Sequence, residues 1–244
     1  MDVKSTFLNG VLEEELYVEQ PLGCMRRGEE KKVLRLKKAL YGLKQAPRAW
    51  NERIDTYFKK NGYEQCLYEH PLYIKKKGED VMFTVLYVDD LIFTGNNAEL
   101  IEAFKEVTKK EFEMTNLGLM KYFLGLEVVQ GKDDIFVSQE RYVEEVLKKF
   151  KMTSCNPVST LMEPGTKVSK YADRDRVDAS KYRSLIESLR YLTNTRPNLM
   201  LSVGITSRYM EEPRYTHWKA LKRILRYVRG TISLGLMYTR TNDY

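Results

Sequence analysis

The stretch LYVDDLIFTG, residues 86–95, decides how this chain folds and which chemistry it can carry. Two adjacent aspartates, Asp89 and Asp90, stand between apolar runs at residues 81–87 and 91–93. These runs are rich in Val, Phe, Tyr and Ile, and they predict two short strands with the aspartates at the hairpin tip. A carboxylate pair there suits magnesium, which prefers oxygen ligands. An ordinary turn is the other interpretation, because Asp is also a favoured turn residue.

The composition favours a folded protein over a disordered one. The chain has 244 residues, 43% of them hydrophobic and 31% charged, enough for one large or two smaller domains. Its longest apolar stretch, near residues 81–88, is too short to span a bilayer, so no membrane partner is expected. The three cysteines are far apart and give neither zinc-ligand spacing nor a disulfide framework. With no signal-peptide pattern at the N-terminus, this usage predicts a reduced, intracellular protein.

The charge of the chain points to an anionic partner. The net charge is +7, which favours nucleic acid first. Seven basic residues and no acidic one fall between Glu212 and Asp243. Within residues 217–229 the basic side chains lie mostly off the apolar face of a predicted helix. A solvated helix face and a nucleic-acid track both remain open for them.

Helical periodicity appears in several places along the chain. One helix is predicted between Pro47, suited to a first turn, and Gly62, suited to a helix end. A second follows the capping pair Asn96 and Glu99, and a third starts at Ser138. The last part of the chain is predicted to be mostly helical, over residues 178–194, 198–211 and 214–229.

Strand-like runs complete the pattern. Residues 33–40 alternate imperfectly and predict a strand, and residues 121–129 predict another, paired with 135–137. A final run at 232–238 has no obvious partner. The fold class is therefore α+β, with a mixed domain first and a basic helical segment after it.

Several segments, taken in order, give the chain a family resemblance. MDVKSTFLNG (1–10), LKKALYGLKQAPRAWNERI (36–54), LYVDDLIFTG (86–95) and KYFLGLEVV (121–129) resemble the reverse transcriptase of copia-type LTR retrotransposons. IFVSQERYVEEVLKKFKM (135–152), YRSLIESLRYLTNTRPNLM (182–200) and HWKALKRILRYVRGT (217–231) are similar to the region that follows it in the same Pol polyprotein. The resemblance spans nearly the whole chain.

This resemblance implies a right-hand polymerase palm and assigns its catalytic and metal-binding carboxylates to Asp2, Asp89 and Asp90. Two magnesium ions, with manganese as a substitute, are expected there. Ions roughly 3.5–4 Å apart stabilise the attacking and leaving oxygens of nucleotidyl transfer. Asp89 is expected to be the more direct ligand of the hairpin pair, while the sequence leaves the role of Asp90 open.

The resemblance also implies substrate and primer contacts. Phe7 matches the residue whose ring excludes a ribonucleotide 2′-hydroxyl, whereas the residue type without the resemblance favours a core phenylalanine. Gln45 and Tyr87 match substrate-binding positions; by composition alone Gln45 is a surface glutamine. The primer grip, a hairpin that positions the primer terminus, is assigned to residues 124–126, namely Leu124, Gly125 and Leu126.

The same resemblance divides the chain into functional parts. Residues 1–151 correspond to a partial palm with the primer-grip hairpin and the start of the thumb, and residues 152–177 to a linker. Residues 178–231 correspond to a basic helical connection region, and residues 232–244 to a truncated lead-in to a missing RNase H domain. The fingers that precede Asp2 in the family are expected to be missing. Glu187, where the family has a small residue, is expected to place a charge near a helix contact.

The predicted function is RNA-directed DNA polymerase activity by two-metal nucleotidyl transfer, carried by a fragment. Its partners are an RNA template, a DNA primer and product, deoxynucleoside triphosphates, and the RNase H and integrase domains of the parent polyprotein. The parent element places this work in a cytoplasmic virus-like particle or the nucleus. The alternative is a non-catalytic relic or nucleic-acid-binding module, and a regulatory or interaction protein derived from the element is a third hypothesis.

Overall fold

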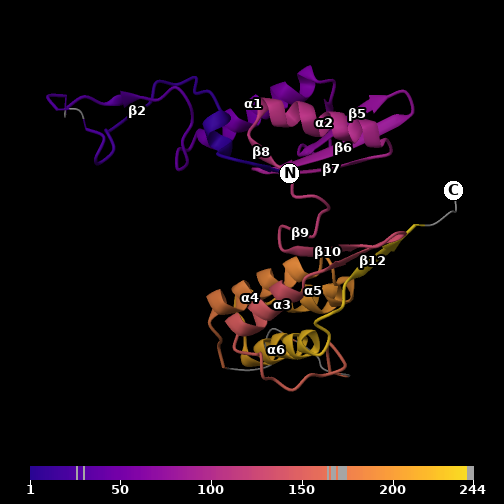
Figure 1. Ribbon diagram of the computed structural model, residues 1–244. Helices are drawn as coiled ribbons and strands as arrows, with labels where there is room; N and C mark the ends of the chain where they lie inside the picture. The colour runs from indigo at the N-terminus through magenta and orange to yellow at the C-terminus, as the bar shows by residue number, and fades with distance from the viewer. Residues whose placement is uncertain (26, 30, 164, 166–168, 170–174, 241–244) are drawn as a thin grey trace. The chain divides into compact units, whose positions relative to one another are not determined.

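The computed structural model describes residues 1–25, 27–29, 31–163, 165, 169 and 175–240, in two compact units (Figure 1). The first unit is Met1–Gly118 and the second is Leu119–Tyr244. Over the described residues the chain forms six α-helices and antiparallel sheets, which confirms the predicted mixture of α and β structure. The palm, thumb and connection assignments remain predictions. None of the described helices is long and apolar enough to cross a membrane.

The first unit is built on a six-stranded antiparallel sheet that holds the predicted hairpin. The strand order is β4 (Glu64–Gln65), β5 (Leu72–Lys77), β6 (Asp80–Tyr87), β7 (Asp90–Gly95), β1 (Asp2–Val3), β8 (Met114–Thr115). Strands β6 and β7 flank the two aspartates as the sequence predicts. Short β1 therefore lies between β7 and β8, although more than eighty residues separate it from either in the sequence.

Two helices cover one face of this sheet with apolar side chains. Helix α1 (Ala46–Lys60) has proline in its first turn and ends before Gly62, whose φ of +77° suits glycine. Helix α2 (Ala98–Glu111) is capped by Asn97, whose side chain accepts from the backbone N–H of Glu99 and Leu100. The capping residue is thus Asn97 rather than the predicted Asn96, whose side chain instead binds the sheet.

The apolar faces of these helices meet the sheet in one core. The buried residues are Met1, Val3, Trp50, Ile54, Tyr57, Phe58, Tyr63, Tyr73, Met82, Leu86, Leu91, Phe104 and Phe112. Aromatic rings make up much of this core, with edge-on contacts such as that of Trp50 with Phe112 at 5.4 Å between ring centroids. The core lies on the helix side of the sheet, and the residues that alternate with it, such as Phe83 and Tyr87 of β6, face the other way and are exposed.

Between β1 and α1 the chain makes a short 3₁₀ turn and a two-stranded ribbon. The turn η1 spans Thr6–Asn9, and the ribbon pairs β2 (Tyr17–Val18) with β3 (Leu34–Arg35). Only two residues of the predicted strand at 33–40 are therefore a strand. The segment around β2 extends away from α1 and α2 of the same unit (Figure 1).

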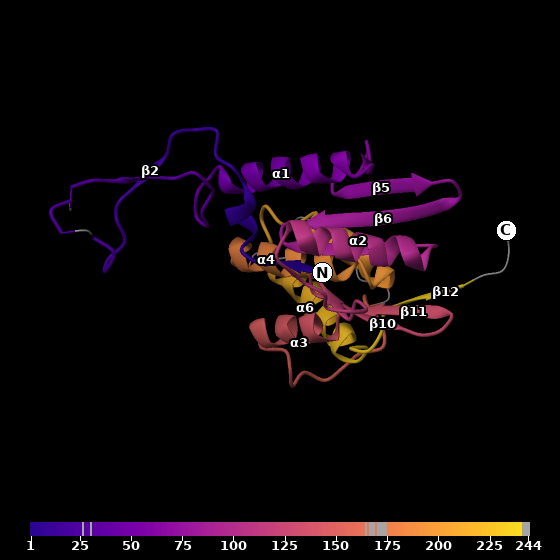
Figure 2. The same cartoon turned by 45° about the horizontal axis from the view of Figure 1, so that its top comes forward.

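The second unit contains a four-stranded antiparallel sheet in the order β12-β11-β10-β9, of which β10, β11 and β12 are labelled in Figure 2. Its strands are β12 (Leu236–Thr239), β11 (Asp134–Ser138), β10 (Leu126–Gln130) and β9 (Tyr122–Phe123). The prediction of one strand over 121–129 is wrong, because a turn at 124–125 divides it into β9 and β10. The final run, which lacked an obvious partner in the sequence, pairs with β11 as β12.

Four helices pack beside this sheet. They are α3 (Glu140–Lys149), α4 (Ala179–Leu192), α5 (Met200–Ser207) and α6 (Tyr215–Arg229), and the short 3₁₀ turn η2 (Pro197–Leu199) precedes α5. Ser138 ends β11 rather than starting α3, whose N-cap is Gln139. The predicted helix over 198–211 is the η2 turn followed by α5, which ends at residue 207.

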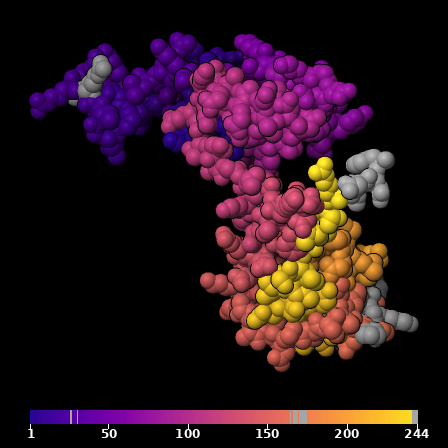
Figure 3. Space-filling view, turned by 45° about the vertical axis from the view of Figure 1, so that its right-hand side comes forward, coloured from indigo at the N-terminus to yellow at the C-terminus, as the bar shows by residue number. Residues whose placement is uncertain are grey.

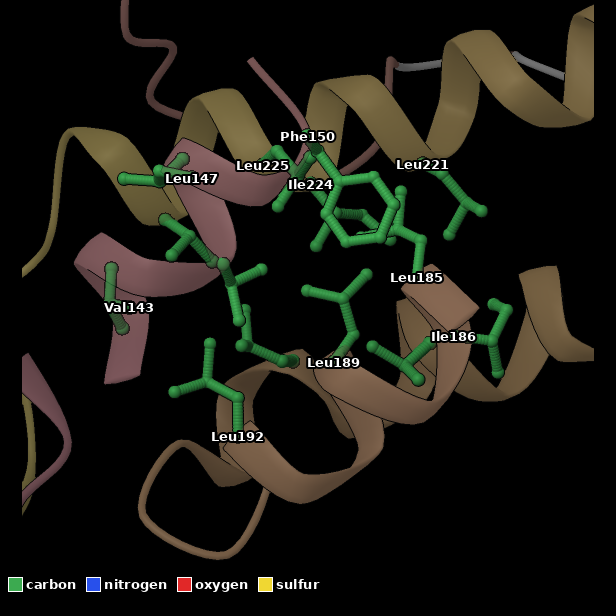
Figure 4. Close-up of a cluster of buried hydrophobic side chains, with 14 of the residues drawn as sticks. Val143, Leu147, Phe150, Leu185, Ile186, Leu189, Leu192, Leu221, Ile224 and Leu225 are labelled. Carbon is green, nitrogen blue, oxygen red and sulfur yellow. The ribbon is translucent and has the colours of Figure 1, made fainter. Parts of the chain in front are cut away.

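Helices α3, α4 and α6 meet in an apolar core (Figure 4). Figure 4 shows side chains from the three helices converging on one space, including Leu147, Leu189 and Leu225. All three are at most 1% exposed. Glu187 of α4 lies between buried Ile186 and Ser188, so its charge is near the helix contact as expected, but it is exposed and is not buried in that contact.

Basic residues of α6 fasten the preceding segment to the helix. Arg223 donates to the Thr160 hydroxyl, Arg226 to the Asn156 carbonyl and Arg229 to the Thr153 carbonyl, at 2.7–2.9 Å. Part of the predicted linker at 152–177 is thus held on α6, and residues 164, 166–168 and 170–174 of it lie outside the described residues. In Figure 3 the C-terminal residues, in yellow, cover one face of this unit. The sequence offered a solvated helix face or a nucleic-acid track for the basic residues of α6. Neither interpretation included the bonds by which these three arginines hold the preceding segment.

Candidate active site

The sheet of the first unit places Asp2 directly opposite Asp90. Their Cα atoms are partners across the antiparallel β1–β7 pair. The Val3 N–H donates to the Asp89 carbonyl at 2.9 Å, and the Leu91 N–H donates to the Met1 carbonyl at 2.8 Å. The ladder bonds therefore flank the aspartate pair, which makes it a non-hydrogen-bonded pair, the type whose side chains lie closer together. Two carboxylates distant in sequence are side by side.

The same row of the sheet continues on both sides of the two aspartates. Tyr87 of β6 is the partner of Asp90, and Thr115 of β8 is the partner of Asp2. Directly opposed residues share a face, so Tyr87, Asp90, Asp2 and Thr115 form one polar row. Neighbouring Leu86 and Leu91, which point the other way, are 7% and 1% exposed in the core. The carboxylate row thus occupies the face away from α1 and α2.

Asp89 lies in the turn beside this row. Val88 and Asp89 are the two central residues of a tight turn between β6 and β7. Val88 has a φ of +53°, a left-handed conformation that a β-branched residue rarely adopts. The Trp50 indole N–H of α1 donates to the Val88 carbonyl at 2.6 Å. The turn that presents Asp89 is therefore strained at Val88 and is hydrogen-bonded to helix α1.

The electrostatics of the row are those of crowded negative charge. Burial raises the pKa of Asp90 above its ordinary value, and the carboxylates of Asp89 and Asp2 raise it further. The α-amino group of Met1 acts in the opposite direction on the same pKa. That group donates to the Leu91 carbonyl at 2.7 Å. Burial and the neighbouring negative charge thus make the charged form of Asp90 less favourable than that of an isolated aspartate, and a bound cation would offset this cost.

The donor set fits magnesium in its chemistry. Asp2, Asp89 and Asp90 supply carboxylate oxygens, the ligands that this hard cation prefers, and all three are partly exposed. Within the described residues, however, no three His, Cys, Asp or Glu side chains come close enough together to hold a metal ion. Asp2 and Asp90 are paired by the sheet, and Asp89 sits at its edge.

The other predicted substrate residues lie around the N-terminal end of α1. Gln45 is the N-cap of that helix and is half-buried. The Phe7 ring packs against Tyr41, with ring centroids 4.6 Å apart, and against the apolar core. Arg48 forms ion pairs with Glu13, Glu14 and Glu52 at 3.1–3.7 Å. Arg48, three residues after Gln45, is therefore already surrounded by three carboxylates.

An open pocket of about 440 Å³ lies behind the turn, on the helix side of the sheet. Its lining residues are Phe7, Pro47, Trp50, Asn51, Gln65, His70, Pro71, Tyr73, Leu86 and Val88. Among the predicted site residues, Phe7 is the one that lines this pocket, whereas Tyr87 belongs to the carboxylate row on the other face.

The residues assigned to the primer grip form a tight hairpin in the second unit. Leu124 and Gly125 are the two central residues of the β9–β10 turn, with φ values of +48° and +81°. Positive φ at both positions is typical of a type I′ turn, for which glycine is well suited. The Tyr191 hydroxyl of α4 donates to the Leu124 carbonyl. A Cβ added at Gly125 would lie 3.0 Å from the same hydroxyl.

Residues 1–164 match a family model described as reverse transcriptase (RNA-dependent DNA polymerase). The chain belongs to the reverse transcriptase family. The predicted resemblance to the Pol polyproteins of copia-type retrotransposons is confirmed. No solved structure matches the chain significantly.

Three relatives show how far this reverse transcriptase resemblance extends. The retrovirus-related Pol polyprotein from transposon RE2 of Arabidopsis thaliana is 35% identical over 242 residues, covering 99% of this chain and 17% of that protein. The Pol polyprotein from transposon TNT 1-94 of Nicotiana tabacum is 39% identical over 241 residues, covering 95% and 18% respectively. A transposon Ty5-1 protein of Saccharomyces cerevisiae is 33% identical, covering 98% and 78%. The chain thus spans less than a fifth of the two Pol polyproteins.

The sequence does not predict two contacts around the carboxylate row. Trp50 is 2% exposed, as expected of a core residue, and no sequence pattern predicts the hydrogen bond from its indole N–H to the Val88 carbonyl. A buried tryptophan N–H usually has a hydrogen-bond partner, so the sequence predicts that a bond exists. It does not predict which residue accepts the bond. Thr115 had no signal, because its place beside Asp2 depends on the pairing of β1 with β8.

Proposed function

We propose that this chain contains the palm of an RNA-directed DNA polymerase together with the region that follows the palm. In this proposal Asp2, Asp89 and Asp90 form the catalytic carboxylate cluster. The observation that carries the proposal is the pairing of Asp2 with Asp90 in the row that also contains Tyr87. A polymerase needs carboxylates from distant segments on one face, because neighbours on a single strand point to opposite faces. The pairing of β1 with β7 brings Asp2 and Asp90, which are distant in sequence, to the same face of the sheet.

The metal chemistry of this proposal uses magnesium, with manganese as a substitute. Two ions bound at such a cluster would stabilise the attacking primer oxygen and the leaving pyrophosphate. Asp2, Asp89 and Asp90 would hold them. The raised pKa of Asp90 supports the assignment, since the site accumulates negative charge that a cation offsets.

The remaining site residues position substrates in this proposal. Tyr87 stands next to Asp90 on the exposed face, with half of its surface accessible, and is suited to contact the primer end or nucleotide. Gln45 and Phe7 are proposed to contact the incoming nucleotide, with the Phe7 ring excluding a 2′-hydroxyl. The Leu124–Gly125 turn with Leu126 is proposed as the primer grip. The template is RNA, and the RNase H and integrase domains of a parent polyprotein are its partners, inside a cytoplasmic virus-like particle.

The net charge of the chain favours a second candidate, a nucleic-acid-binding module without catalysis. The net charge of +7 supports attraction to any polyphosphate, regardless of whether the carboxylates hold metal. Binding without extension is the result that this candidate predicts.

Magnesium-dependent primer extension on a primed RNA template tests the first candidate. The wild-type chain should extend the primer, and Asp89→Asn and Asp90→Asn should each reduce the rate by at least about 100-fold, the size typical of losing one preorganised electrostatic group. Glu79→Gln, which changes an exposed acid at the opposite end of β6, is the matched control and should extend like the wild type.

Two outcomes would count against the catalytic assignment. Extension by Asp89→Asn at the wild-type rate would remove that residue from the cluster. If neither the wild type nor any variant extends the primer, while all of them retain salt-sensitive binding to the primed template, the second candidate replaces the first. Folding of each protein is checked by circular dichroism before either result is interpreted.

A further inference from the structure

The turn between β6 and β7 has a backbone conformation that its residues do not favour. Of its two central residues, only Val88 has a positive φ, +53°. This pattern usually has glycine at the first central position, because a Cβ crowds the backbone there. A β-branched valine in this region is a strained choice that persists only when the surroundings enforce it. Some contact outside the turn must therefore stabilise it.

Trp50 provides that contact from helix α1. Its indole N–H donates to the Val88 carbonyl at 2.6 Å, across 38 residues of sequence. The Trp50 side chain is 2% exposed and is held edge-on against Phe112, which is also 2% exposed. The donor is therefore held in place, because a buried indole packed against a buried ring has little freedom to follow a moving carbonyl.

Packing alone does not hold the turn on this side. Val88 is 47% exposed, and both Val88 and Trp50 line the open pocket of about 440 Å³ behind the turn. A side chain that is half exposed and borders an open pocket is packed on one side only, so packing opposes a change of its backbone angle weakly. The hydrogen bond from Trp50 is thus the specific restraint from the helix side.

The restraint acts next to the catalytic pair. The Val88 carbonyl is bound by Trp50, and the carbonyl of the following residue, Asp89, accepts from the Val3 N–H at 2.9 Å. Both peptide groups that flank the Asp89 side chain are therefore fixed, one by the helix and one by β1. Because Asp2 directly precedes Val3, the same pairing sets the separation of Asp2 from Asp89 and Asp90.

We propose that Trp50 is a positioning residue: its indole N–H holds the strained Val88 turn in the conformation that keeps Asp89 and Asp90 in register with Asp2. The catalytic consequence of this inference rests on the proposed function, whereas the structural restraint does not. Trp50 touches no reacting group, and acts through the Val88 carbonyl.

Amide exchange in the full chain tests the restraint without any assay of polymerisation. Trp50→Phe keeps a buried ring and removes the donor. It should speed exchange of the Val3 and Leu91 amides roughly 10-fold, the factor that corresponds to losing one buried hydrogen bond. Amides in the middle of α2 should not change. Trp218→Phe, the other tryptophan of the chain, lies in the second unit and is the matched control, with no change expected at Val3.

Rescue by glycine separates positioning from ordinary packing. Val88→Gly relieves the positive-φ strain, so in that background the effect of Trp50→Phe on Val3 exchange should fall to roughly 3-fold or less, a coupling of the kind seen between contacting residues. Equal effects of Trp50→Phe in both backgrounds would overturn the inference, because they would show that Trp50 acts only through the core.

A measurement on the unmutated side chain covers the case in which Trp50→Phe fails to fold. The chain has two tryptophans, so Trp218→Phe leaves a single indole N–H signal, that of Trp50. This N–H should be strongly protected from exchange with water, and Val88→Gly should reduce its protection. An indole N–H that exchanges as fast as an exposed one would refute the restraint. If the restraint is found but no variant extends a primer, the proposed function fails and the positioning contact stands.

Discussion

The two turns at the ends of strand β6 share a backbone pattern and differ in the residue that adopts it. Gly78 and Glu79 connect β5 to β6, and Val88 and Asp89 connect β6 to β7. In each turn only the first central residue has a positive φ, +64° at Gly78 and +53° at Val88. The first turn uses the residue that this conformation favours, and the second uses a β-branched residue that it disfavours.

The surroundings explain how both turns persist. A Cβ placed at Gly78 would meet nothing within 4 Å, so this turn forms by its own residue preference. The turn at Val88 is bound by the Trp50 indole and by the backbone of β1. The comparison teaches that the β6–β7 turn is maintained by tertiary contacts. Strain of this kind is common where a turn presents functional groups, and this turn presents Asp89, which we propose as a metal ligand.

Moving the strain to the unsupported end of β6 should have the largest effect. Gly78→Val puts a β-branched residue at φ +64° with no restraint, and should lower the free energy of unfolding of the first unit by about 1–2 kcal/mol. Urea denaturation followed by amide exchange in β5 and β6 measures this. Glu79→Val, at the neighbouring position without positive φ, is the control and should cost less. Equal losses for the two variants would contradict the backbone explanation.

Much of this fold follows from sequence patterns with local causes. The alternation around residues 81–93 predicts the β6–β7 hairpin, and proline and glycine predict the bounds of α1 within one or two residues. These signals are local, because side-chain period and turn chemistry act over a few residues. The family resemblance, carried by ordered segments, predicts the reverse transcriptase family that the comparisons show.

The rest depends on contacts between distant segments. Strand β12 had no visible partner because its pairing with β11 joins residues about one hundred apart. The bond from Trp50 to Val88 and the pairing of Asp2 with Asp90 have the same origin. The assignment of Asp2 came from resemblance alone, since a lone aspartate near a terminus has no local signal. The division of 121–129 was missed because Leu124, not glycine, opens the turn.

The turn at Leu124–Gly125 offers a third case, with positive φ at both positions and glycine at one. The Tyr191 hydroxyl donates to the Leu124 carbonyl. Tyr191→Phe removes this bond, and should lower the stability of the second unit by about 0.5–1 kcal/mol, since a partly exposed carbonyl can bind water instead. Faster exchange of the Val128 amide, which closes the hairpin on Lys121, is the specific readout.

Tyr142→Phe is the matched control for this change. The Tyr142 ring lies edge-on to Tyr191, and its hydroxyl donates to the Ser188 carbonyl in α4 rather than to the hairpin. A similar loss of overall stability is expected, without faster exchange at Val128. If both variants loosen Val128 equally, the tyrosine pair stabilises the unit as a whole and Tyr191 has no particular role at the turn.

The smallest effect concerns charge in the carboxylate row. Burial and the neighbouring Asp89 and Asp2 raise the folded-state pKa of Asp90 above its ordinary value of 3.8. Between these two pKa values the folded state binds more protons than the unfolded state, so stability falls as pH rises through that window and then levels off. Asp90→Asn removes this dependence. At neutral pH, without divalent metal, it should therefore be more stable than the wild type by about 0.5 kcal/mol, as for a relieved like-charge cross-strand pair.

Urea midpoints measured across pH at low ionic strength test this, with Glu79→Gln as the control that keeps the row intact. The gap between wild type and Asp90→Asn should open as pH rises from 3.8 toward the raised pKa of Asp90 and should shrink with added salt, because partly exposed charges are screened. A wild type that gains stability relative to Asp90→Asn over the same window would contradict the repulsion. The β6–β7 turn would then carry backbone strain only, and its carboxylates would not repel one another in the absence of a cation.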